Sequence, residues 1–430
     1  MLHNTFCRRL AALVLTLAVA VSAVLPVFAV YPMPIQTATE TEAVYLFNAD
    51  TGKTLLTQNA DQPRYVASLT KMMTALLLLE SGKDLNGEVT VPTDLTQEFK
   101  DIQNANGTTM GLRIGETVRR IDLLNALLIT SANDAASVIA WDVGGSLNAF
   151  IQQMNARAAE LGCTSATFTC AHGLYDYGNV ASAEDMAKIA AACAANETFA
   201  QVAGSTTYTL GQTNFHSEQR TISSSNPLMD ASGAYYKDSV KWVKGGFTTL
   251  AGRCAVALDQ KDGHTYGLVI LGSDSNEHLY SECDELFDWA FASFADRPLV
   301  DTQTVVTTVD LTKCRTHPEV ELYAAAPVSG YGHADDKVSY SFDLPESVSA
   351  TVKNGQKLGT ATVYLDGCEV GQVDLVTHQE YVSDFRTDSR STLLLLAALA
   401  VILLVLSVVT LACGGGSLNL NRRRRMKRRR

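Results

Sequence analysis

Residues 65–80 read YVASLTKMMTALLLLE, and this stretch decides how the rest of the chain is interpreted. From Ser68 onward, apolar side chains occupy nearly every side of a helix, which is typical of a helix buried inside a domain. Ser68 and Lys71 lie three residues apart at its start, so they share one face and the amine can reach the hydroxyl. The stretch therefore predicts a central helix that carries a serine and a lysine into the interior.

A serine–lysine pair of this kind can act in nucleophilic catalysis. The hydroxyl of a serine is a weak nucleophile until a base accepts its proton, and an unprotonated lysine can be that base. Burial disfavours the ammonium form, and the apolar helix would supply the burial. The tetrad alone is weak evidence, because Ser-x-x-Lys should occur about once by chance in a chain of this length. Ser68 also fits a simple helix cap.

Two further short patterns follow along the chain. Ser131-Ala132-Asn133 lies at a break between two helical stretches, where a loop can place a hydroxyl and an amide in a cleft. The Ser-x-Asn spacing recurs elsewhere in the chain, so it carries little weight alone. Lys244-Gly245-Gly246 ends a predicted strand, where glycines allow close approach to the backbone and the lysine can receive a carboxylate. The alternative interpretation of this sequence is a solvent-exposed lysine beside a β-bulge.

The three patterns, in this order, resemble those of the serine-type D-alanyl-D-alanine carboxypeptidases, the low-molecular-mass penicillin-binding proteins. The segments MGLRIGE, LLITSANDAA, SAEDMAKIA and SSNPLM look like the same family. The resemblance is close from residue 42 to about 295 and looser to about 380. It implies an α+β fold: a β-lactamase/transpeptidase-like domain, in which helices flank an antiparallel sheet beside a helical lobe, and then a small all-β domain.

The resemblance also implies roles for single residues. Ser68 would attack the carbonyl between two D-alanines, Lys71 would be the general base, and Ser131 would pass the proton to the leaving amine. The expected substrate-binding residues are Asn133, Lys244, Gly246 and Phe247. Backbone N–H groups of Ser68 and Phe247 would form the oxyanion hole. No metal or organic cofactor is implied. The expected partners are peptidoglycan stem peptides and, as covalent inhibitors, β-lactam antibiotics.

One departure and several alternatives remain. The family has Lys-Thr-Gly where this chain has Lys244-Gly245-Gly246, so one hydroxyl is missing near the substrate carboxylate. This prompts the alternative of a catalytically weak peptidoglycan-binding or scaffolding protein. A Ser-His-Asp hydrolase is disfavoured, because no Gly-x-Ser-x-Gly elbow exists and His172 and His216 are interpreted as structural. A class A β-lactamase would need a Glu-x-x-Leu-Asn motif after Asn133. Transpeptidase or endopeptidase side activity stays open.

The two ends of the chain predict export and anchoring. Residues 1–29 combine two arginines, a short apolar run and the small-residue site Val27-Phe28-Ala29, which is typical of a signal peptide. A membrane anchor is the alternative for this run. Residues 393–413 form an uncharged stretch that would span about 30 Å as a helix. The basic tail, 414–430, should stay on the cytoplasmic side. The catalytic body would then lie outside the cell membrane.

The charge of the exported body excludes one class of partner. Of 34 basic residues, two lie in the signal peptide and eight in the tail, which leaves 24 against 45 acidic residues, or about −21. A body this acidic is not expected to bind nucleic acid.

The stretch between the predicted signal peptide and the predicted membrane helix is long enough for two domains. The predicted limits are 30–297 for the peptidase domain, 298–380 for a β-sandwich and 381–392 for a linker. An early hairpin over 42–60 should join late strands over 240–272 in one antiparallel sheet, with helices on both faces. Predicted helices cover 122–161, 181–194 and 276–294.

The body holds an odd number of cysteines: Cys163, Cys170, Cys193, Cys254, Cys283, Cys314 and Cys368. The odd count and irregular spacing argue against a disulfide framework, and several are expected to be buried free thiols. Cys163 and Cys170 are the closest pair in sequence. No His/Cys spacing suggests a metal site.

Overall fold

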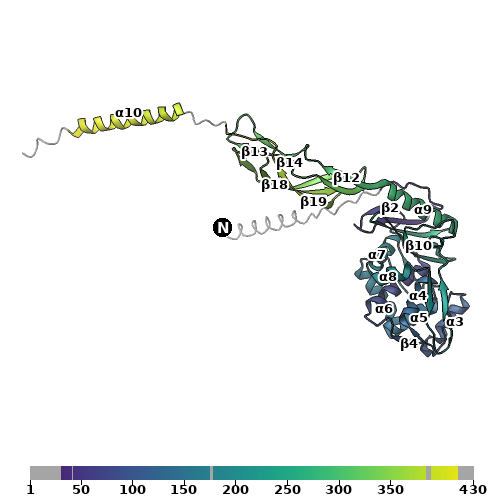
Figure 1. Cartoon of the computed structure of the whole chain (residues 1–430). Helices are drawn as coiled ribbons and strands as arrows, with labels where there is room; N and C mark the ends of the chain where they lie inside the picture. The colour runs from purple at the N-terminus through teal and green to yellow at the C-terminus, as the bar shows by residue number, and fades with distance from the viewer. Residues whose placement is uncertain (1–30, 41, 175–177, 384–388, 415–430) are drawn as a thin grey trace, which may run out of the picture. The chain divides into compact units, whose positions relative to one another are not determined.

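A computed structural model describes residues 31–40, 42–174, 178–383 and 389–414 (Figure 1). The predicted signal peptide, 1–29, and the basic tail beyond Gly414 lie outside the described residues. The chain divides into two compact units. The first extends to Asp296 and also includes Tyr331–Lys337, whereas the second contains Arg297–Gly330 and the residues from Val338 onward.

The first unit is built on a five-stranded antiparallel sheet with the order β2-β1-β11-β10-β9. Its strands are β1 (Ala43–Asn48), β2 (Thr54–Gln58), β9 (Val240–Thr248), β10 (Gly252–Lys261) and β11 (His264–Ser273). The early hairpin thus pairs with the last strand, as predicted. Asp262 and Gly263 turn β10 into β11 with φ angles of 53° and 86°, the left-handed conformations that such a tight hairpin requires.

Helices cover both faces of the sheet. They are α2 (Thr70–Glu80), α3 (Thr96–Asn104), α4 (Arg120–Ile129), α5 (Asn133–Gly144), α6 (Leu147–Glu160), α7 (Ala183–Ala194), α8 (Glu197–Ala203) and α9 (Asn276–Ser293). Side chains of α9 pack against one face of the sheet, whereas α2 and α7 pack in the hydrophobic core on the other. In Figure 1, α4 to α8 form a helical lobe on the side of the strands away from α9.

Serine side chains and a glycine cap three helix ends. The Ser146 side chain accepts the Ala149 N–H at the start of α6, and Ser182 accepts the Asp185 N–H at the start of α7. Gly145 closes α5 with φ 73°. The remaining short elements of this unit are β3 (Arg64–Tyr65), η1 (Ala67–Leu69), β4 (Glu88–Thr90), η2 (Thr93–Leu95), β5 (Thr117–Arg119), β6 (Val180–Ala181), β7 (Thr207–Leu210) and β8 (Arg220–Ser223).

The segment 331–337 returns to the first unit through a buried ion pair. Lys53 Nζ lies 2.9 Å from Asp336 Oδ1, and the Tyr31 hydroxyl donates to the same oxygen. Lys53 and Asp336 are 8% and 6% exposed. Removing either partner would leave the other charge buried and unpaired, which would strongly destabilise the folded protein.

The second unit is all-β, as predicted. Its strands are β13 (Val305–Thr312), β14 (Glu319–Ala324), β16 (Val338–Asp343), β17 (Ser347–Ser349), β18 (Lys357–Leu365) and β19 (Cys368–Val376), together with parts of β12 (Phe294–Val300) and β15 (Val328–His333). Hydrogen bonds join six of them in the order β16-β18-β19-β14-β13-β17, around a core that includes Val320, Leu322 and Val363. Face-to-face packing as a sandwich stays a prediction.

The chain continues into α10 (Ser389–Gly414). Its segment Leu393–Leu411 is long and apolar enough to cross a membrane. This segment is consistent with the membrane anchor predicted for residues 393–413.

An unpredicted pair of acidic side chains is buried in the first unit. Glu42 is 0% exposed and Glu282, on α9, is 5% exposed. The Ala38 N–H donates to Glu282 Oε1 at 2.6 Å. Burial, and then the neighbouring charge of Glu282, raise the pKa of Glu42 from 4.5 to about 8. The carboxyl of Glu42 is therefore protonated in the folded protein at neutral pH.

This raised pKa makes stability depend on pH. Below pH 4.5 both the folded and the unfolded chain bind the proton. Between pH 4.5 and 8 only the folded chain keeps it, so the free energy of unfolding falls as the pH rises through this window. We expect Glu42→Gln to remove most of this loss, so that its thermal midpoint matches the native value at pH 5 and exceeds it at pH 8.

The matched control is Glu40→Gln, which makes the same charge change at an exposed position two residues away. It should follow the native pH profile. Identical profiles for Glu42→Gln and Glu40→Gln would contradict a protonated Glu42.

Candidate active site

Ser68 lies in η1, the single 3-10 turn that leads into α2. Ala67, the preceding residue, has φ 47°, a conformation that side-chain-bearing residues rarely adopt. The turn leaves Ser68 half-buried, while Lys71 on the first turn of α2 is fully buried. The two side chains therefore meet at the edge of the interior.

Lys71 contacts both the serine and a backbone carbonyl. Its Nζ lies 2.9 Å from Ser68 Oγ and donates to the His172 carbonyl at 2.7 Å. Burial, and then the charge of Lys244, hold the pKa of Lys71 well below its ordinary value. A neutral amine beside a serine hydroxyl can accept the hydroxyl proton.

Ser131 and Lys244 form a second pair. Ser131 occupies the turn between α4 and α5 with φ 60°. Lys244 Nζ on β9 donates to Ser131 Oγ at 3.0 Å and to the Gly245 carbonyl at 2.7 Å. Burial lowers the pKa of Lys244 to about 7. A bound carboxylate would favour the ammonium form and so bind most strongly to a charged Lys244.

Asn133 is held at the start of α5 by the loop opposite. Its N–H and its Nδ2 both donate to the Thr108 carbonyl, at 2.8 Å and 3.0 Å. The next residue, Asp134, accepts the N–H groups of Met110, Gly111 and Leu112, each at 3.0 Å. These bonds fix the 108–112 loop against the turn that carries Ser131.

Gly246 allows β9 to approach the serine. A Cβ on Gly246 would lie 2.9 Å from Ser68 N and 3.2 Å from Ala67 Cβ, so a side chain would push the strand away. Phe247 follows with 52% of its surface exposed. The guanidinium of Arg253 lies 3.8 Å from the centre of the Phe247 ring, an attractive cation–π distance.

Gly245 has more room. The atoms nearest to an added Cβ would be Asn226 Nδ2 at 3.5 Å and Tyr280 Oη and Cys254 O, both at 3.9 Å. These are ordinary contact distances, and the first two atoms can form hydrogen bonds. The space left by the missing threonine is therefore bordered by polar groups.

These residues share one cleft of about 520 Å³. Its lining includes six predicted site residues: Ser68, Ser131, Asn133, Lys244, Gly246 and Phe247. Lys71, the seventh, lies behind Ser68 in the interior. The structure thus brings all the predicted site residues together from three separate parts of the sequence.

Sequence reasoning missed several groups around this cleft. The His172 carbonyl that binds Lys71 has no signature in sequence, because any residue offers a carbonyl. Asn226, Arg253 and Tyr280 also line the cleft. Arg253 and Tyr280 come from segments without a motif, whereas Asn226 lies in the family-like segment SSNPLM, to which no role was assigned.

The sequence matches two family models in succession. The model of the D-alanyl-D-alanine carboxypeptidase family matches residues 32–275, and that of the penicillin-binding protein 5 C-terminal domain matches residues 294–383. The chain is 27% identical over 333 residues to D-alanyl-D-alanine carboxypeptidase DacF of Bacillus subtilis, covering 77% of this chain and 83% of that protein. It is 28% identical over 348 residues to DacC of Escherichia coli, covering 78% and 83%.

Solved structures agree on the fold. A crystal structure of penicillin-binding protein 5 from Haemophilus influenzae superposes with a TM-score of 0.58 at 24% identity, covering 81% of this chain and 99% of that chain. The D-alanyl-D-alanine carboxypeptidase from Mycobacterium tuberculosis superposes with a TM-score of 0.53 at 26% identity, covering 61% and 94%.

Proposed function

Because the chain belongs to the D-alanyl-D-alanine carboxypeptidase family, we propose that it removes the terminal D-alanine from peptidoglycan pentapeptide stems through an acyl-enzyme on Ser68. The observation that carries this assignment is the 2.9 Å contact between Ser68 Oγ and a fully buried Lys71. Burial lowers the pKa of Lys71 and so favours the neutral amine, which is the form that a general base needs.

In the proposed reaction Lys71 takes the Ser68 proton as Oγ attacks the carbonyl carbon between the two D-alanines. Backbone N–H groups of Ser68 and Phe247 would stabilise the oxyanion. Lys244 would hold the terminal carboxylate, and Ser131, 3.0 Å from Lys244 Nζ, would pass a proton to the leaving amine. Water then releases the shortened stem. A β-lactam would acylate the same serine.

The enzyme is favoured over the non-catalytic scaffold, because the curated relatives are named as carboxypeptidases or endopeptidases. The polar groups beside Gly245 also weaken the argument for a scaffold, since Asn226 and Tyr280 offer hydrogen bonds where the threonine hydroxyl is missing. Transpeptidase or endopeptidase activity of the same site on peptidoglycan cross-links remains an alternative.

Two measurements on the purified protein test the proposal. Incubation with a diacyl-D-Ala-D-Ala tripeptide should release D-alanine, and a fluorescent penicillin should label the chain covalently at Ser68, as located by peptide mass. A chain that binds peptidoglycan without either reaction would overturn the enzyme assignment in favour of the scaffold.

We place the catalytic unit outside the cytoplasm, anchored by α10. A chain truncated after Ser391 should therefore be soluble and as active as the full chain, because the anchor contributes no group to the cleft. Fractionation and penicillin labelling of both forms check this. Retention of the truncated form on membranes would mean that another segment also binds lipid.

The Gly245→Thr variant should raise kcat/KM about tenfold on a D-Ala-D-Ala substrate. A hydrogen bond to a charged group contributes about 1.5–3 kcal/mol, equivalent to roughly 10- to 150-fold. We expect the lower end of this range, because Asn226 and Tyr280 already border the space where the threonine hydroxyl would lie. The added Cβ has no neighbour closer than 3.5 Å, so the side chain should fit.

The matched control is Gly245→Val, which adds nearly the same volume without a hydroxyl. It should not gain activity. Equal rates for the threonine and valine variants would show that the hydroxyl is not what the site lacks.

A further inference from the structure

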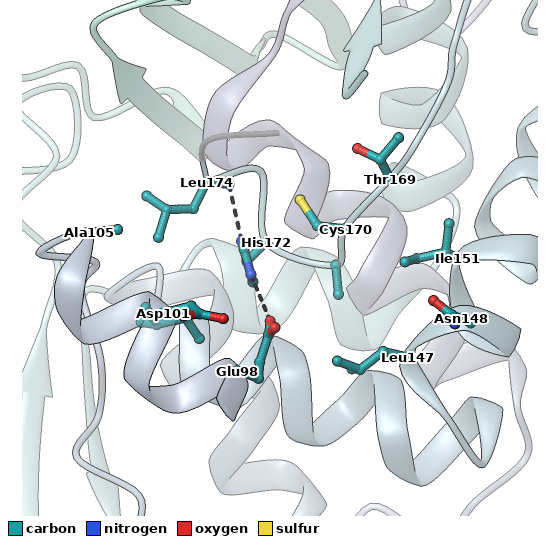
Figure 2. Close-up of a pocket in the computed structure, with 12 residues that line it drawn as sticks. Glu98, Asp101, Ala105, Leu147, Asn148, Ile151, Thr169, Cys170, His172 and Leu174 are labelled. Atoms are coloured by element: carbon teal, nitrogen blue, oxygen red, sulfur yellow. Dashed lines mark hydrogen bonds and ion pairs between the residues drawn. The ribbon is translucent and has the colours of Figure 1, made fainter. Parts of the chain in front are cut away.

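A second cavity, of about 450 Å³, is lined by the loop whose His172 carbonyl binds Lys71, and it shares only Leu174 with the lining of the substrate cleft. Its walls come from α3, from α6 and from the loop Thr169–Leu174. The carboxylate of Glu98 and the side chains of Cys170 and His172 line it together (Figure 2). The proposed reaction uses none of these side chains.

Glu98 and His172 are hydrogen-bonded, and Cys170 lies beside them. His172 Nε2 lies 3.0 Å from Glu98 Oε1, and His172 Nδ1 accepts the Leu174 N–H at 3.0 Å. Figure 2 shows the His172 ring between these two partners, with Cys170 beside it. The Gly173 N–H donates to Cys170 Sγ at 3.2 Å. The sulfur thus has a hydrogen-bond donor and an oriented imidazole next to it.

These contacts favour the thiolate. Burial would raise the pKa of the Cys170 thiol, but the neighbouring His172 imidazole and backbone N–H groups outweigh it and place the pKa below the ordinary value of 9.0. Cys163 is also half-buried, but burial and the charge of Asp185 raise its pKa to about 11. Because the thiolate is the nucleophile, the two cysteines should differ in reactivity.

The loop that carries Cys170 is fixed to the catalytic helix. The Ala171 carbonyl accepts the Thr74 hydroxyl at 2.6 Å, and the His172 carbonyl accepts Lys71 Nζ at 2.7 Å. At Gly173 an added Cβ would lie 1.8 Å from the Ala67 carbonyl, so the backbones are in close contact. A change at Cys170 that shifts this loop will reach Lys71 directly.

We propose that Cys170 is a site of reversible thiol modification, which takes small disulfides from the cavity and thereby slows acylation of Ser68. The Cys170 thiolate attacks one sulfur of a low-molecular-mass disulfide. The S–S bond of that disulfide breaks, a new S–S bond forms to Cys170, and the second sulfur leaves as a thiolate that solvent protonates. A thiol reductant reverses the exchange.

The cavity also selects the charge of the disulfide. Glu98 and Asp101 both line it, so a cationic disulfide should enter more readily than an anionic one. Added salt should reduce the difference. Cystamine and 3,3′-dithiodipropionate, which are similar in size and opposite in charge, are suitable probes.

The first test is labelling at pH 7, followed by peptide mass. Cystamine should modify Cys170 about tenfold faster than Cys163, because the larger thiolate fraction of Cys170 outweighs the lower nucleophilicity of a more acidic thiol. Cystamine should also react faster than 3,3′-dithiodipropionate. Replacement of His172 by glutamine should slow modification of Cys170 and not of Cys163. Equal labelling of the two cysteines would overturn the proposal.

The second test measures acylation by fluorescent penicillin before and after cystamine. In the native chain, cystamine should slow acylation at least tenfold, and dithiothreitol should restore the rate. In Cys170→Ser and Cys170→Ala, cystamine should not change the rate of acylation. Unchanged acylation of a fully modified native chain would refute the regulatory role. The acylation measurement rests on the proposed function, whereas labelling of Cys170 does not. If the unmodified chain is not acylated by penicillin, the proposed function fails, and the labelling experiment still tests the reactivity of Cys170.

Discussion

The Ser68→Ala variant is expected to lose both covalent labelling by penicillin and release of D-alanine from a D-Ala-D-Ala peptide. Its Oγ is the only atom that the proposed mechanism uses to form the acyl-enzyme, so no partial route through that intermediate remains. The expected loss is complete within the detection limit of either assay. Binding of substrate should persist, because Lys244 and Asn133 are unchanged.

The control for Ser68→Ala is Ser225→Ala, which removes an exposed hydroxyl from the rim of the same cleft. It should label at the native rate. Penicillin labelling that survives in Ser68→Ala, at any serine, would reassign the nucleophile.

Replacement of Lys71 should slow acylation by about 10²–10⁴-fold, the usual cost of losing a positioned base. Lys71→Met is the sharper variant, because it fills most of the same buried space without an amine. The rate constant for penicillin acylation, measured by stopped-flow fluorescence, gives the effect on the chemical step separately from release of product.

The pH profile distinguishes a base from a structural contact. Since burial and Lys244 depress the pKa of Lys71, the native amine is neutral at lower pH than an ordinary lysine, and acylation should rise with pH through that depressed value. Lys71→Met should lose this limb of the profile. A variant that retains the same pH limb, or acylates within tenfold of the native rate, would remove Lys71 from the role of base.

The sheet and the cleft follow from patterns that depend on side-chain type. Alternating apolar runs marked β1, β10 and β11, and their pairing was predictable because an isolated hairpin needs further strands to bury its apolar face. The motif residues were predictable because nucleophile, base and carboxylate acceptor must be particular amino acids. Their convergence in one cleft was predictable because each motif lies at the end of a helix or strand of the same domain.

Other features depend on backbone or long-range burial that sequence does not record. Ala67 adopts φ 47° although alanine has no preference for it. The Glu42–Glu282 pair was not predicted, because acidic residues indicate surface unless a partner is known. The return of residues 331–337 to Lys53 joins side chains 283 positions apart, and no local pattern reports such a contact.

The order of the strands has a consequence for how the chain reaches its folded state. Ala43 pairs with Leu271, so β1 must wait for more than two hundred further residues before its neighbour β11 exists. During synthesis the first hairpin stays open along one edge, and unpaired edges favour association between chains. The helices of the lobe close over short distances and can form earlier, whereas the sheet, with its distant pairings, should set the rate of folding. We therefore expect the chain to be most prone to association while residues 43–58 await their partner.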